Sequence, residues 1–231
     1  MKKVFLFVYI LFFSGVLISQ NTNVISGPMV SFIDGYSTQI WFLLDKDAKN
    51  IKIDFKDYDE DKLLEYNFTV TNEHQFTQYV PYTVTIEKLL PNTEYIASVY
   101  VDDIFIKELD IFTKRPHLDD IQFLLGYNLT NSTSSSLFTH MRRTNSDFMV
   151  WLGGYVSYAD DRVNFNNIFN SYVNSRIKPE INDFISSLPQ IASWNSLDYG
   201  SDLGFNWALK DSVYLAFDIF WPNSLNKTYN Y

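Results

Sequence analysis

Small and polar residues close three apolar runs of the chain, and these are the positions where chemistry could be done. Asn128 follows the run FLLGY, Gly153-Gly154 follows FMVWL, and Asn195 and Asp198 follow PQIASW. Short apolar runs bounded by turn residues predict buried strands. Ligands of open α/β sheets bind at the carboxyl ends of the strands, so we expect these residues at one rim. Three buried strands that each end in a small or polar turn are the layout of an active-site rim.

Two further groups of side chains could contribute to a site. Asp160 and Asp161 come shortly after the glycine pair and could supply oxygen ligands, although a solvated loop is the simpler explanation. His140, Arg142 and Arg143 could form an anion site or simply the exposed end of a helix. The sequence has no Gly-x-Ser-x-Gly, no cysteine and no phosphate-binding glycine-rich loop, so those patterns support no alternative chemistry.

The elements that must position these residues alternate between strand and helix after the linker that ends at Pro116. Such alternation predicts an α/β part. Strands are expected at 121–125 and 148–152 and within the segment 189–200. A short helix is expected at 137–143 with Leu137, Phe138 and Met141 inward, a second at 176–188 with Pro179 in its first turn, and a third at 209–221.

Seven short alternating runs before the linker predict a β-sandwich over residues 21–115. They span residues 28–33, 38–44, 51–55, 63–70, 83–86, 94–101 and 104–112. The segment Leu89-Leu-Pro-Asn-Thr-Glu-Tyr95 resembles the fibronectin type III corner, in which the tyrosine hydroxyl bonds back to the preceding loop. Trp41 is a candidate core tryptophan. The acidic run at 57–61 reads as a solvated hairpin tip, since it lacks the glycine-pivoted spacing of a calcium loop.

Four segments carry a family resemblance: FLLGYN, DFMVWLGGYVSY, YVNSRIKPEINDFISSLPQIASWNSLDYG and KDSVYLAFDIFWPN. In this order they resemble the PhoD-like alkaline phosphatases, a branch of the metallophosphoesterases. Members of that family typically read GSCxY, WLGDNxY, an Arg-x-x-Pro helix, PxxAxWDDHDxG and KD…F…WPN. The resemblance spans roughly residues 24 to 223. It implies hydrolysis of phosphate mono- or diesters, with calcium and iron ions as cofactors and a phosphate ester as substrate.

The chain departs from the family at the metal site. The family's functional positions fall on Asn128, Gly154, Ser157, Asn195, Ser196, Leu197 and Asp198. Among them only Asp198 keeps a carboxylate, and Gly154 offers no side chain where the family places a metal-bound aspartate. Family members also continue past the point that corresponds to Tyr231 into a second half with further ligands. We therefore expect a partial fold with at least one sheet edge or face uncovered.

A metallophosphoesterase holds two or three cations, which lie about 3.5–4 Å apart in two-metal sites, and it needs a bridging carboxylate with several anionic or imidazole ligands. Asp198 alone does not hold such a site, so we predict a homologue with impaired catalysis that binds no metal. Two alternatives stay open. One is a non-catalytic binding or surface module that acts through the sandwich, with an unknown protein partner. The other is an active phosphoesterase built from Asp160, Asp161, Asp198 and Asn128.

The first twenty residues predict a secretory leader. Lys2 and Lys3 precede the apolar run Val4–Val16, and Ser19-Gln20 is a plausible cleavage edge. A membrane anchor is disfavoured because this run is shorter than the ~20 residues that span a bilayer. The prediction is a secreted or periplasmic protein without stable membrane insertion. A net charge of −9 argues against nucleic-acid partners.

The predicted architecture is a β-sandwich plus α/β protein. Residues 1–20 form the signal peptide and 21–115 a fibronectin- or immunoglobulin-like domain. Residues 116–231 form the first half of a PhoD-like metallophosphoesterase α/β sandwich.

Overall fold

The computed structural model describes residues 23–59, 62–63, 67–71, 78–113, 120–129, 135–156, 164–199 and 208–223. The predicted leader, the linker at Pro116, Ser157, Asp160 and Asp161 lie outside these residues. No described helix is long and apolar enough to cross a membrane.

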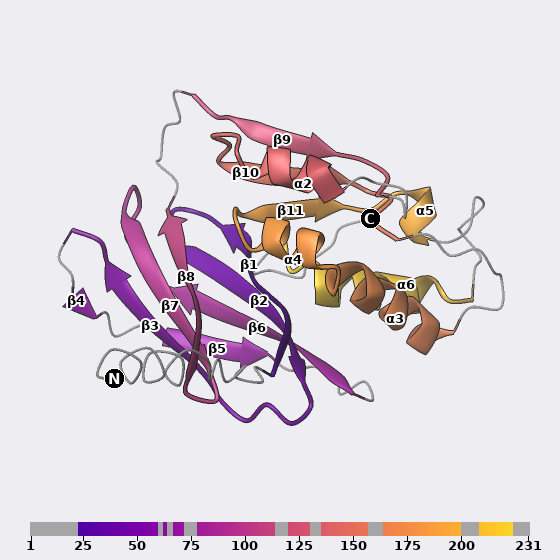
Figure 1. Ribbon diagram of the computed structural model, residues 1–231, viewed down its shortest axis with the longest axis horizontal. Helices are drawn as coiled ribbons and strands as arrows, with labels where there is room; N and C mark the ends of the chain where they lie inside the picture. The colour runs from indigo at the N-terminus through magenta and orange to yellow at the C-terminus, as the bar shows by residue number, and fades with distance from the viewer. Residues whose placement is uncertain are drawn as a thin grey trace, which may run out of the picture.

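Two antiparallel four-stranded sheets build the N-terminal part (Figure 1). The first has the order β1 (Val24–Ile33), β2 (Ser37–Asp45), β6 (Tyr79–Glu87) and β5 (Asn67–Thr71). The second has the order β4 (Lys62–Leu63), β3 (Ile51–Asp57), β7 (Glu94–Val101) and β8 (Ile104–Phe112). Alternate side chains from both sheets, among them Ile40 and Phe42 of β2 with Phe55 and Val99, pack into one apolar cluster. The predicted β-sandwich is therefore present.

The prediction of a single strand at 63–70 was wrong. The run at 63–70 forms two strands, and β4 pairs with β3 in one sheet while β5 pairs with β6 in the other. The chain thus changes sheets within this run. Alternation of side chains reports the strand conformation but not which neighbour a strand pairs with, so the sequence pattern could not show the change.

The tyrosine corner is confirmed. Tyr95 is buried at the start of β7, and its ring stacks on Phe55 with centroids 4.9 Å apart. The Tyr95 hydroxyl accepts a 2.8 Å hydrogen bond from the backbone N–H of Leu90. The loop before β7 is therefore tied to the strand that follows it.

The C-terminal part contains a parallel three-stranded sheet with the order β11 (Gln190–Ser193), β10 (Phe148–Leu152) and β9 (Phe123–Gly126). Its helices are α2 (Ser135–Met141), α3 (Phe165–Arg176), α4 (Pro179–Ile185), α5 (Ser196–Tyr199) and α6 (Lys210–Phe220). On one face of the sheet, Met149, Trp151 and Ala192 pack against residues of α2, α3, α4 and α6. This is the alternating strand–helix part that the sequence predicted.

Three details of that part differ from prediction. The helix expected at 176–188 is the end of α3 followed by α4, because Pro179 begins a new helix at its first position. Leu137 is not inward but 48% exposed, whereas Phe138 is buried. Strand β9 is not buried on both faces, since Leu125 is 59% exposed.

The two parts share one core. Strand β2 is buried along both of its faces. Its Ile40, Phe42 and Leu44 face the sandwich interior, while Trp41 and Leu43 face the helices. Trp41 is thus a core tryptophan as predicted, but it lies between the sandwich and the helical layer, where its Nε1 donates a 2.8 Å hydrogen bond to the Ile219 carbonyl.

Candidate functional site

The carboxyl ends of β9, β10 and β11 bring the predicted residues together. Asn128 follows β9, Gly153 and Gly154 follow β10, and Asn195 follows β11. The Asn128 N–H donates to the Gly153 carbonyl at 3.1 Å, and the next N–H, of Leu129, donates to the Gly154 carbonyl at 2.8 Å. The turns after β9 and β10 are therefore joined backbone to backbone, and the rim predicted from the sequence exists.

The rim is closely packed at the glycine pair. Gly153 and Gly154 have φ of +85° and +73°, a region that side-chain-bearing residues rarely adopt. A Cβ on Gly154 would lie 2.7 Å from the Asn128 Cα, and a Cβ on Gly153 would lie 2.6 Å from the Asn195 Cβ. Side chains at either position would require the facing turn to move.

The Asp198 carboxylate binds the backbone of the turn that follows β10. It lies in α5 and is fully buried. One carboxylate oxygen, Oδ2, accepts the N–H of Gly154 at 2.7 Å and that of Asn195 at 3.1 Å. The other, Oδ1, accepts the N–H of Tyr155 at 2.8 Å and that of Val156 at 3.2 Å. Burial raises the pKa of Asp198, and these four donors oppose that rise because they stabilise the charged form.

Asn195 is also engaged by the backbone. It precedes α5, and its Oδ1 accepts the N–H groups of Leu197 at 2.8 Å and Asp198 at 3.3 Å. This is the usual role of an asparagine at the start of a helix. Ser196 begins α5 and is exposed. The side-chain oxygens of Asn195 and Asp198 therefore stabilise the turns instead of facing an open site.

The other predicted groups do not converge on the rim. His140 contacts the Ser136 carbonyl of its own helix through Nδ1 at 2.6 Å. Arg142 forms a surface ion pair with Asp183 at 3.4 Å. Among the described residues, no group of three or more histidine, cysteine, aspartate or glutamate side chains lies together as a metal site.

The sequence did not predict that Arg176 lies in the core. Arg176 is fully buried, and its guanidinium carbon lies 4.0, 4.9 and 5.0 Å from the ring centroids of Trp221, Trp41 and Tyr155. The hydrogen bonds of the guanidinium go to the Phe220 carbonyl at 2.7 Å and to the Met29 sulfur at 3.0 Å. Burial lowers the pKa of Arg176.

One sequence signal could have located this arginine. Phe169, Tyr172, Val173 and Arg176 share a face of α3 at helical spacing, and the first three are apolar or aromatic. A charge on such a face must be buried and compensated by its neighbours.

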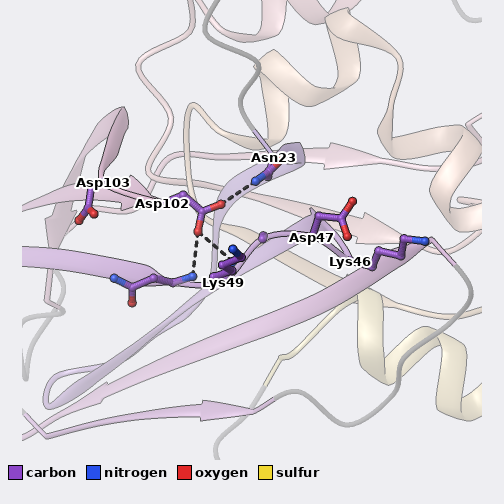
Figure 2. A pocket seen from close by; sticks show the side chains of 8 residues that line it. Asn23, Lys46, Asp47, Lys49, Asp102 and Asp103 are labelled. Carbon is purple, nitrogen blue, oxygen red and sulfur yellow. Dashed lines mark hydrogen bonds between the residues drawn. The ribbon is translucent and has the colours of Figure 1, made fainter.

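An open depression of about 750 Å³ lies at one end of the sandwich, away from the rim (Figure 2). Asp102 is central there and accepts hydrogen bonds from Asn23 Nδ2 and from the N–H groups of Lys49 and Asn50. The Lys49 N–H is the main cause that lowers the pKa of Asp102. Figure 2 shows Asp47 and Asp103 pointing away from Asp102, so the acidic groups do not converge.

With this geometry in place, a comparison with solved structures identifies the architecture. The structure matches a solved structure of PhoD with a TM-score of 0.69 over 94% of this chain, at 13% identity. The chain has the fold of PhoD. It spans about half of the PhoD chain, since the match covers 49% of that chain. The predicted PhoD-like resemblance is thus confirmed at the level of the fold.

Other comparisons add little to the PhoD match. Amylomaltase from Corynebacterium glutamicum matches at 9% identity over 68% of this chain and 23% of that chain, with a TM-score of 0.30. Astrotactin-2 matches at 13% identity over 86% and 35% of the two chains, with a TM-score of 0.28. No protein-family model and no curated protein matches the sequence.

Proposed function

We propose that this chain is an exported homologue of PhoD-like phosphoesterases whose metal-dependent hydrolysis is impaired and whose present role is non-catalytic. The PhoD fold supports the phosphoesterase ancestry. The observation that carries the loss of catalysis is the engagement of Asp198, because both of its oxygens already accept two backbone hydrogen bonds each.

The described residues do not fit the calcium and iron ions that the family implies. A two-metal site needs a bridging carboxylate and further charged ligands around an open position. Here Gly154 has no side chain and its Cα faces the Asn128 backbone, while Asp198 is buried behind the turn. No hydrolytic step through a metal is therefore assigned to this rim.

The alternative is an active phosphoesterase with atypical ligands. Because Asp198 is engaged by the backbone, such a site would depend on Asp160 and Asp161, which lie outside the described residues, with help from Asn128. Asn128 is exposed at the rim and can present its amide oxygen.

Metal content and hydrolysis decide between the two. The purified mature chain is analysed for bound metal after incubation with calcium, iron, manganese or zinc. It is assayed on a chromogenic phosphate monoester and a diester, with a PhoD-like enzyme that keeps the full motifs as a positive control. The proposal expects no stoichiometric metal and no turnover above the protein-free rate in a sample that melts cooperatively.

The variant that tests the atypical site is the double substitution Asp160→Asn and Asp161→Asn. If the wild type binds metal and turns over substrate, and this double variant abolishes both, the non-catalytic proposal is wrong and the atypical site exists. Asp198→Ala is not suitable for this purpose because it removes the acceptor of four backbone N–H groups and would unfold the rim. A matched control is Asp183→Asn, on the exposed surface of α4.

Two finer assignments belong to this proposal. The sandwich is a fibronectin type III-like packing module, supported by its two four-stranded sheets and the Tyr95 corner.

Export rests on the predicted leader. The test of export is cell fractionation with N-terminal sequencing of the recovered protein. A start near residue 21 supports export, and an intact Met1 in the cytoplasm overturns it.

A further inference from the structure

One face of the parallel sheet is apolar, and no described helix or strand covers it. Alternate residues of β9 and β10 point to this side, and Phe123, Leu125 and Leu152 are 48%, 59% and 46% exposed. The residues between them face the helices, where Met149 and Trp151 are buried. Ile121 and Tyr127, which continue the same alternation at either end of β9, are 44% and 64% exposed. In Figure 1, β9 is the outermost strand of the sheet.

Parallel sheets occur almost only with both faces covered, so this face is suited to bury against a further layer. Its strand positions carry no charged side chain; they are Phe123, Leu125, Phe148, Val150, Leu152, Ile191 and Ser193. The rings of Phe123 and Phe148 stack on each other with centroids 5.4 Å apart and planes within 3°, so aromatic carbon occupies the amino end of this face.

We propose that this face packs against the same face of a second copy of the chain. Because this face carries no charged side chain, two copies can meet there without bringing like charges together, although the net charge of the chain is −9. Two such sheets would pack face to face about 10 Å apart. Asp120 and Asp147 are exposed at the amino end of the sheet. An antiparallel arrangement across the two-fold axis keeps these carboxylates at opposite ends of the interface.

The apolar area exposed on this face limits how tightly two copies can associate. Five side chains that each expose about half of roughly 200 Å² present about 500 Å² per copy. The two copies together would bury about 1,000 Å², which is the lower limit for a specific interface. The expected dimer is therefore weak and depends on concentration. This inference is independent of whether the rim is catalytic.

Sedimentation equilibrium of the mature chain from about 1 to about 100 μM covers the affinities expected of so small an interface. The proposal expects the average mass to rise toward twice the monomer mass. Leu125→Lys keeps the fold, because the side chain is exposed, and should hold the protein monomeric. The matched control is Phe105→Lys, which places the same charge on β8 of the sandwich at a side chain that is 54% exposed. This control should dimerise like the wild type.

The absence of cysteine provides a second test. A single Val150→Cys on the central strand should form a disulfide-linked dimer under mild oxidation, and Phe105→Cys should not. A wild type that stays monomeric throughout, or variants at both positions that behave alike, would overturn the proposal. A monomer that binds a hydrophobic dye, with binding lost in Leu125→Lys, also overturns it. In that case the face would be a docking site for a different polypeptide and not for a second copy of this chain.

Discussion

At the residue scale, Asp198 stabilises a turn by accepting four backbone hydrogen bonds. We predict that Asp198→Asn lowers the free energy of unfolding by about 3 kcal/mol, because an amide offers one acceptor oxygen where the carboxylate offers two. Its NH₂ group would face two N–H donors, which are left unsatisfied in a buried place. Urea denaturation followed by circular dichroism measures the change.

The control for this prediction is Asp183→Asn, which removes a surface carboxylate with a side chain 64% exposed. Its effect should stay below about 0.5 kcal/mol, as is usual for exposed ion pairs. Equal effects of the two substitutions would show that Asp198 is not the anchor of the turn.

Arg176 gives a second prediction at this scale. Its guanidinium is stabilised by cation–π contacts with aromatic rings and by the Phe220 carbonyl, without a carboxylate among the described residues. Lysine keeps the buried charge but loses the planar contacts. Methionine removes the charge and fills similar space. We therefore expect Arg176→Lys to destabilise the protein by about 3 kcal/mol and Arg176→Met by less, since an uncompensated buried charge is the larger cost.

The order of these two variants is the decisive readout for Arg176. Thermal and urea unfolding of both, measured beside the wild type, give it directly. If Arg176→Met is the more damaging, the positive charge makes a net contribution to stability, and the account in which the buried charge is the larger cost is wrong.

At the element scale, the turns after β9 and β10 fit together only without a side chain at position 154. Gly154→Asp restores the carboxylate of the family motif, yet we predict neither metal binding nor hydrolysis. The new Cβ would meet the Asn128 backbone at 2.7 Å, at a φ that favours glycine. A loss of stability of about 1–3 kcal/mol should accompany the change. Ser196→Ala, at an exposed position of the same rim, is the control and should be neutral.

Stoichiometric metal in Gly154→Asp, with turnover that the wild type lacks, would contradict this account. It would mean that the turns separate readily and that a single substitution explains the loss of the site. Elemental analysis, the chromogenic assay and a melting curve on the same sample distinguish that result from simple unfolding.

The elements were predictable where local signals were strong. The bounds of β10 follow from an apolar run closed by two glycines, and Pro179 marked the first turn of a helix, although the break between α3 and α4 was not predicted. The sequence also placed Asn128, Gly154 and Asn195 at one rim. It could not reveal that Asp198 lies beneath the turn, because its partners at 154–156 are more than 40 residues away. Nor could it show that β4 and β5 belong to different sheets, since strand pairing depends on tertiary packing.

At the scale of the whole molecule, the sandwich and the α/β part depend on a common core. Ser26 Oγ and the Gly27 N–H both donate to Asn182 Oδ1 of α4, at 3.0 and 2.9 Å. The Lys107 ammonium on β8 donates to the Ser186 carbonyl just after α4. Together with Trp41 and Arg176, these contacts link strands near the start of the chain to helices near its end.

The last prediction tests this dependence. A chain limited to residues 21–115 would expose Met29, Trp41 and Leu43, which are all 0% exposed in the intact protein. Exposing these three large side chains to water would lower the free energy of unfolding by roughly 5–9 kcal/mol, which is comparable to the whole stability of a small domain. We expect this fragment to aggregate or to melt without cooperativity, and its tryptophan emission to shift to longer wavelength. Replacing Trp41 and Leu43 with threonine should restore solubility, because their neighbours Ile40, Phe42 and Leu44 still fill the sandwich core. A wild-type fragment that is monomeric and melts cooperatively would instead show that the sandwich folds alone and that the shared core is a docked interface between two independent domains.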